Sequence, residues 1–248
     1  EALAPVPDGA RVIDAQGGHV TPGLIDCHSH TGISGGVNET GRRVTSEVRI
    51  GDVINPDDIN FYRQLAGGLT AANLLHGSAN AIGGQNAVIK LRWGASHPEE
   101  MKAEGAMPGI KFALGENPKR VYGRRKTAPS TRMGNVAGYR SSWIKAQRYI
   151  DDWSEYERKI TEQEATNTGA EGNAALAAAL NKPPKRDLEL ETLAGVLKGD
   201  IIVHMHCYRA DEMVTIMDMA DEFGYQVGTF HHGVEAYKIA DQLAQNGV

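Results

Sequence analysis

Three short apolar runs in this 248-residue chain each lead directly into a pair of histidines. The runs are LIDC, DIIV and YQVGTF, and the pairs that follow them are, in order, His28 and His30, His204 and His206, and His231 and His232. Helical patterns separate the runs, which indicates parallel strands joined by right-handed crossovers. Because the carboxyl ends of parallel strands lie at one edge, we expect six of the nine histidines to gather there.

The rest of the chain continues this alternation of strands and helices. Strands are expected at 24–27, 69–75, 87–91, 110–114, 200–204 and 225–230, and helices at 55–66, 141–160, 187–197, 210–223 and 235–245. The segment GSANAIGG at 77–84 is predicted to be a simple connection, and 162–184 to be a surface insertion. The helix expected at 141–160 has one apolar stripe, which predicts a face packed on the core. The stripe consists of Trp143, Ala146, Ile150, Trp153 and Ile160.

Paired histidines at strand ends are typical of a metal site. Neutral imidazole nitrogens bind a divalent ion such as Zn²⁺ and can leave a position open for water. In a His-x-His pair both side chains leave an extended strand on the same side, so both can face one ion. We therefore predict one or two divalent ions per chain, with zinc as the first choice.

Several of these segments resemble one known family. PGLIDCHSH resembles the first-strand signature of the amidohydrolase superfamily, and VIDAQGGHV resembles the passage that leads into its barrel. GGLTAANLL is similar to the second strand, IIVHMHCYRADEM to the strand carrying a third histidine, and TFHHG to the strand carrying a fourth. Within the superfamily the chain resembles the imidazolonepropionase-like amidohydrolases of unassigned substrate.

The resemblance implies a fold and a reaction. The fold is a (β/α)₈ barrel of the TIM type, expected here as an incomplete barrel of about six strand-helix units at 21–248. Residues 1–20 would be the last piece of a small β-sandwich. The reaction is hydrolysis of a C-N bond in an amide, a cyclic amide or a dipeptide by metal-activated hydroxide. The substrate would be a small molecule, and a homo-oligomer is an open alternative to a monomer.

The resemblance also assigns roles to residues. The metal ligands would be His28, His30, His204 and His232, whereas three other residues would lie behind the ligands or contact substrate: His206, His231 and Arg209. A further ligand would be Glu116 or a carboxylated Lys111. We favour Glu116 at this point, because it follows its strand whereas Lys111 is expected to start it, and because a carboxylate binds a cation without modification.

One catalytic group of the family has no counterpart in the chain. The aspartate expected at the end of an eighth strand, which moves a proton to the leaving nitrogen, has no candidate here. Both ends of the chain look like cuts inside a larger domain. Two alternatives therefore stay open: a catalytically inactive metal-binding fragment whose open sheet edge packs on another copy, and a metal-dependent deaminase.

Composition excludes other classes of protein. The formal net charge of -5 argues against nucleic acid as the main partner, since phosphate binding needs a basic surface. No apolar run approaches the roughly 18 residues of a membrane span, and the first residues have no signal-peptide pattern. We expect a soluble chain whose compartment the sequence does not indicate.

Overall fold

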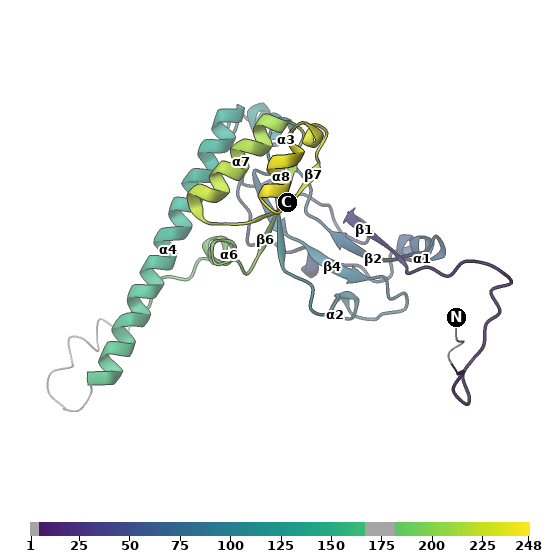
Figure 1. Cartoon of the computed structure of the whole chain (residues 1–248). Coiled ribbons are helices and arrows are strands. Elements are labelled where there is room, and N and C mark those ends of the chain that lie inside the picture. Colours follow the sequence, from purple (N-terminus) through teal and green to yellow (C-terminus); the bar gives the residue numbers. More distant parts are fainter. Residues whose placement is uncertain (1–4, 167–181) are drawn as a thin grey trace.

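The computed structural model describes residues 5–166 and 182–248, and within them the strands form two separate sheets (Figure 1). The first sheet has the order β1-β2-β4 and the second β3-β5-β6-β7. The bounds are β1 Leu24–Ser29, β2 Leu69–Leu74, β3 Ile82–Gln85, β4 Ala87–Lys90, β5 Gly109–Ala113, β6 Ile202–Cys207 and β7 Val227–His232. The predicted α/β class is confirmed.

The sheets are mixed, which corrects the expectation of uniformly parallel strands. β1 and β2 are parallel, as are β5, β6 and β7, but β4 is antiparallel to β2 and β3 is antiparallel to β5. The chain between β2 and β4 contains no helix, and a parallel return would need a crossover of a dozen or more residues, usually helical. Neither sheet is closed, so the described residues form no complete barrel.

Helices alternate with most of the strands along the chain. Their bounds are α1 Ile59–Ala66, α2 Pro98–Met101, α3 Glu116–Arg124, α4 Arg132–Thr166, α6 Leu188–Leu197, α7 Ala210–Phe223 and α8 Ala240–Gln245, with 3₁₀ turns at Ile50–Asp52 (η1) and Ala236–Ile239 (η2). The Asp58 and Asp187 carboxylates cap α1 and α6 by accepting backbone N–H bonds. None of the described helices is long and apolar enough to cross a membrane.

α4 is longer than predicted, and the predictions for two other segments stay untested. α4 begins earlier than expected and runs on to Thr166, projecting away from the sheets (Figure 1). Most of the predicted insertion at 162–184 lies outside the described residues. Residues 5–23 form neither helix nor strand, and they are exposed, so the β-sandwich piece stays a prediction.

The larger core lies on the second sheet. It joins that sheet to α4, α6 and α7, and Trp143 of α4 is fully buried there. The predicted apolar stripe of α4 is buried at Trp143 and Ala146, and only half-buried at Ile150 and beyond, where the helix leaves the body. A second core lies under the first sheet around Phe61 and Met101.

The loop from 37 to 47 follows β1 in the chain and contacts β3 of the second sheet, and Asn80 holds it. The Asn80 amide is 1% exposed and donates to the carbonyl oxygens of Glu39 and Arg42, the latter at 2.8 Å, and to Thr45 Oγ1 at 3.1 Å. Thr45 N in turn donates to Ile82 O of β3 at 3.0 Å. The segment GSANAIGG is therefore more than a connection, because it supplies both β3 and this anchor.

Asn80→Ala is expected to lower the free energy of unfolding by about 2–3 kcal/mol, since it removes the three hydrogen bonds that this buried amide donates to the loop. Denaturant unfolding at pH 7 measures this. Asn246→Ala is a matched control, because Asn246 is exposed and its amide makes only a local bond to Gln242 O. Equal stabilities of the two variants would contradict the anchoring role.

Candidate functional site

The six histidines of the three pairs come together, as predicted from the sequence. The register of the second sheet sets Lys111 of β5 beside His204 of β6, and His206 beside His231 of β7. Partners in register on neighbouring strands place their side chains on the same face. His28 of β1, from the other sheet, meets this face through His231.

Three of the imidazole rings form a hydrogen-bonded chain. His28 Nδ1 lies 2.9 Å from His231 Nδ1, and His231 Nε2 lies 3.1 Å from His204 Nδ1. His231, expected only to lie behind the ligands, is thus the central ring of the chain and is 7% exposed. His231 is therefore in direct contact with His28 and His204, two of the predicted metal ligands.

Two of the three remaining pair members, His206 and His232, lie beside this chain. The His232 ring is 5.0 Å from that of His28 and 4.5 Å from that of His206, centroid to centroid. The backbone of His232 has φ of +73°, an uncommon value for a residue with a side chain. Such strain often accompanies functional sites, and here it turns the last residue of β7 toward the other histidines.

His30 has a defined tautomer. Its Nδ1 lies 2.8 Å from the carbonyl oxygen of Leu75, which can only accept, so Nδ1 carries the proton and Nε2 keeps its lone pair. A seventh histidine, His76, is 2% exposed and makes two bonds: Nδ1 donates to Gly77 O and Nε2 accepts from Glu39 N, both at 2.9 Å. With both ring nitrogens bonded, His76 supports the loop and has no nitrogen left for a metal.

Burial keeps the clustered histidines neutral. Desolvation, reinforced by the positive charge of Lys111, lowers the pKa of His28 and of His204 to about 4. The same causes, together with neighbouring imidazoles, lower the pKa of His206 and His231 to about 3. Neutral imidazole is the form that binds metal ions, so all four rings have the right protonation state at pH 7.

The choice between Glu116 and Lys111 is corrected by the structure. Glu116 starts α3 instead of ending a strand, its side chain is 47% exposed, and it pairs with Lys119 at 2.8 Å. Lys111 stands in the middle of β5 and is fully buried. Its Nζ makes one long contact, 3.4 Å to His76 O, and its charge acts on the clustered histidines. Lys111, not Glu116, therefore lies among the histidines.

Arg209, a predicted neighbour of the site, points elsewhere. It precedes α7 and forms a bidentate ion pair with Asp211, with Nη2 2.8 Å from Oδ2 and Nε 2.9 Å from Oδ1. A residue that the sequence did not single out lies closer. Asn117 of α3 places its amide nitrogen 3.4 Å from His206 Nε2. Nothing in the local sequence signals this contact, which depends on β5 and β6 being neighbours.

The donor set suits a divalent metal ion, although the rings would have to turn. Among the described residues no three His, Cys, Asp or Glu side chains already converge as ligands of one ion. Several lone pairs are instead used in bonds between histidines. His206 Nδ1, however, is buried and has no hydrogen-bond partner in the part of the chain that the structure describes. An orphaned imidazole nitrogen among neutral histidines and a buried lysine fits a site for a borderline cation.

Two comparisons with known proteins bear on this site. The amidohydrolase tasK of Hapsidospora irregularis is 31% identical over 257 residues, which cover 96% of this chain and 25% of that protein. The crystal structure of an amidohydrolase from Thermotoga maritima MSB8 is similar with a TM-score of 0.74 and 35% identity, covering 96% of this chain. These likenesses support an amidohydrolase-type family.

The likeness covers only part of each relative. The chain spans a quarter of the length of tasK and 60% of the Thermotoga chain. No protein-family model matches it. The resemblance to imidazolonepropionase-like members is named by neither relative and stays a prediction.

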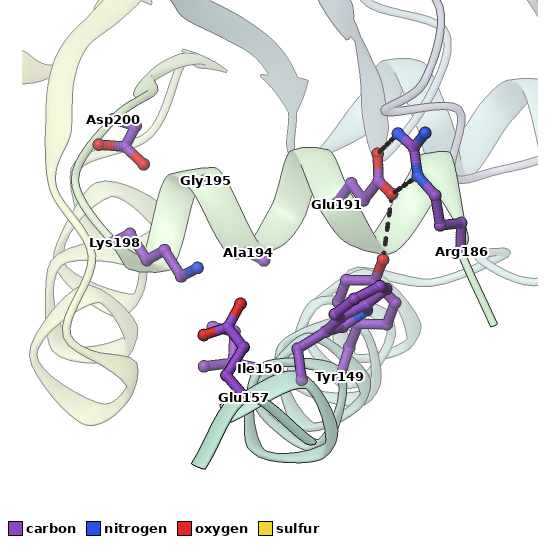
Figure 2. A pocket seen from close by; sticks show the side chains of 10 residues that line it. Tyr149, Ile150, Glu157, Arg186, Glu191, Ala194, Gly195, Lys198 and Asp200 are labelled. Carbon is purple, nitrogen blue, oxygen red and sulfur yellow. Dashed lines mark hydrogen bonds and ion pairs between the residues drawn. The ribbon is translucent and has the colours of Figure 1, made fainter. Parts of the chain in front are cut away.

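A separate hollow lies between α4 and α6 (Figure 2). It measures about 330 Å³, and at one end the Arg186 guanidinium pairs with Glu191, with Nε 2.6 Å from Oε1. Tyr149 Oη donates to the same carboxylate at 3.2 Å. None of the clustered histidines lines this hollow, so it plays no part in the candidate site.

The lowered pKa values predict acid sensitivity of the metal-free chain. Because the folded-state pKa of His206 and of His231 lies below the ordinary 6.5, the unfolded state binds protons first as the pH falls. The contribution of these two rings to stability is therefore complete above pH 6.5 and is lost below it, by up to about 1.4 kcal/mol per pH unit for each ring. Denaturant unfolding at pH 7, 6 and 5 checks this, and an unchanged free energy of unfolding would contradict it.

Proposed function

We propose that this chain belongs to a metal-dependent hydrolase that cleaves a C-N bond of an amide type, as the names of its relatives suggest. The observation that carries the proposal is the gathering of neutral histidines from β1, β6 and β7 around a buried lysine. In this proposal the parallel strands β1, β2, β5, β6 and β7 correspond to strands of a (β/α)₈ barrel, and the longer relatives would contain the full barrel.

The proposed ligands of one or two divalent ions, most simply Zn²⁺, are His28, His30, His204 and His232, with Lys111 between them. When bound, such an ion supplies Lewis-acid polarisation of a carbonyl group and lowers the pKa of water. His206 and His231 support these ligands. In the metal-free chain they bond to Asn117, His28 and His204, and the rings would turn to bind an ion.

Lys111 has a specific role in this proposal. Burial lowers its pKa to about 8, so a substantial neutral fraction exists near physiological pH. A neutral amine adds to carbon dioxide, losing one proton and forming a carbamate, which gives a long side chain ending in two oxygen ligands. Such a carbamate would reach past the short side chains and would remove the cost of a buried ammonium.

Hydrolysis assays test the function. The metal-loaded chain is offered amides, cyclic amides and dipeptides, and the released amine or acid is measured. We expect activity in the wild type and a loss of at least about 10³-fold in His28→Ala, since one ligand of the centre is gone. His19→Ala, an exposed histidine, is the matched control. Equal activity in His28→Ala would refute the proposal, and ammonia release from an amidine substrate would identify a deaminase instead.

A further inference from the structure

The two halves of α4 carry charges of opposite sign. Residues 132–148 contain four arginine or lysine residues and no acid, whereas residues 149–166 contain six acids and two basic residues. The first half therefore has a net charge of +4 and the second half a net charge of -4. At about 1.5 Å per residue the centres of the two halves lie roughly 26 Å apart, well beyond the Debye length of about 8 Å, so they hardly attract each other within one helix.

One long face of α4 is exposed to solvent. It includes two large apolar side chains, Met133, which is 79% exposed, and Ile144, which is 44% exposed. Arg148 and Asp151 continue this face one and two turns after Ile144, and both are exposed. The opposite face packs on the larger core, where Ala146 is fully buried. The exposed face therefore lies on the outside of the molecule, along a helix that projects away from the sheets (Figure 1).

The charges nearest the middle of this face are unpaired. Within the described residues neither Arg148 nor Asp151 makes an ion pair. Arg140, closer to the start of α4, does have a partner, because its Nη2 lies 2.9 Å from Glu222 Oε2 of α7. Arg148 and Asp151 therefore keep their charges for a group outside this part of the chain.

We propose that α4 is a dimer interface, on which the α4 helix of a second copy of this chain packs in the antiparallel direction. A two-fold axis that passes α4 between Tyr149 and Ile150 places Arg148 of each copy opposite Asp151 of the partner subunit, since both residues are equally far from that point. The basic half of each helix then lies on the acidic half of the other. This interface does not depend on the proposed hydrolase activity.

The same register gives the rest of the face a partner. Ile144 comes opposite Glu155 of the partner subunit, and the aliphatic stems of Glu155 and Arg158, which pair at 2.7 Å, can cover it. Arg140, already paired, comes opposite Lys159 of the partner subunit, which pairs with Glu155 at 3.1 Å. Exposed charges of this kind set the direction and register of association more than its strength.

Sedimentation equilibrium of the full chain and of two charge-reversed variants tests the interface. At pH 7.5 and low salt we expect the wild type to dimerise, and about 1 M NaCl to weaken the dimer, because salt screens exposed charges. Arg148→Glu and Asp151→Arg each bring like charges together twice in the dimer, and each should weaken association at least about tenfold. Both positions are exposed, so the variants should keep the fold, which circular dichroism checks.

An equimolar mixture of the two variants distinguishes this interface from any other contact. In a heterodimer of Arg148→Glu with Asp151→Arg, the unchanged Asp151 of one copy faces the unchanged Arg148 of the other, and the two new side chains also have opposite charges. The mixture should therefore associate to within about threefold of the wild type, although neither variant does so alone. Asp218→Arg, which reverses an exposed acid of α7, is the matched control and should dimerise as the wild type does.

A wild type that stays monomeric at low salt up to about 100 µM would overturn the inference and would leave this face to a different protein. Association that both single variants retain would also overturn it, since the contact would then lie elsewhere, for example at an open sheet edge. A mixture that associates no better than its two components would contradict the antiparallel register.

Discussion

Lys111→Met is expected to stabilise the metal-free chain by about 3 kcal/mol while it weakens metal binding. Lys111 is fully buried, and desolvation lowers its pKa from 10.5 to about 8. At about 1.4 kcal/mol per pH unit, keeping this ammonium inside the protein at pH 7 costs about 3 kcal/mol. Methionine fills a similar volume without a charge, so the cost disappears together with the proposed ligand.

The cost of the buried Lys111 ammonium depends on pH. The folded-state pKa lies below the unfolded one, so the penalty is complete below pH 8 and vanishes above 10.5. Urea unfolding of chelator-treated wild type and variant at pH 7 measures the difference, which should shrink at pH 10. Lys198→Met, at an exposed lysine, is the control and should change stability by less than about 0.5 kcal/mol.

A destabilised Lys111→Met chain that still binds metal as the wild type does would contradict both parts of this prediction. The lysine would then be a packing residue whose charge the fold accommodates. A stabilised variant without metal would instead indicate that the chain keeps a costly buried amine for the sake of its site. Such a conflict between stability and function is common where a group must be neutral or modified to act.

Trp143→Ala is expected to lower the free energy of unfolding by about 3–5 kcal/mol. The ring is fully buried in the larger core, with its centroid 5.7 Å from that of Phe112 on β5 and 4.5 Å from that of Tyr225 before β7. Removing it leaves a cavity between α4 and the second sheet, which carries four of the six clustered histidines.

Thermal and denaturant unfolding measure this loss. Trp93→Ala is the matched control, since Trp93 is 44% exposed and its closest ring partner is Tyr62, at 5.7 Å between centroids. We expect the control to lose less than about 1 kcal/mol. Similar losses in both variants would mean that the α4 interface is not the main core of the molecule.

The strands that carry histidines could be predicted because their signals are local. Each is a short apolar run, and the helix at 210–223 between the last two was predicted with its observed ends. β3 was missed because IGGQ follows small and polar residues that are typical of turns. Its strand character comes from pairing with β5 and from isolated bridges to Val44 and Arg49, which are contacts distant in sequence.

Which residues lie at the site depends on where the strands and helices begin and end. Sequence patterns predict these ends poorly. A shift of the strand at 110–114 to Gly109–Ala113 places Lys111 in its middle, and α3 then takes Glu116 into its first turn. Asn117 reaches His206 only because β5 and β6 become neighbours in space. The sequence contains the six histidines, but their bonds to one another exist only in the fold.

The metal content of the purified chain, measured by mass spectrometry without a histidine tag, tests the central claim most directly. We predict one to two equivalents of a divalent ion per chain in the wild type and in His19→Ala, and a loss of at least one equivalent in His28→Ala. A chain that binds no divalent ion after reconstitution with Zn²⁺, or a His28→Ala variant that binds as much as the wild type, would contradict it.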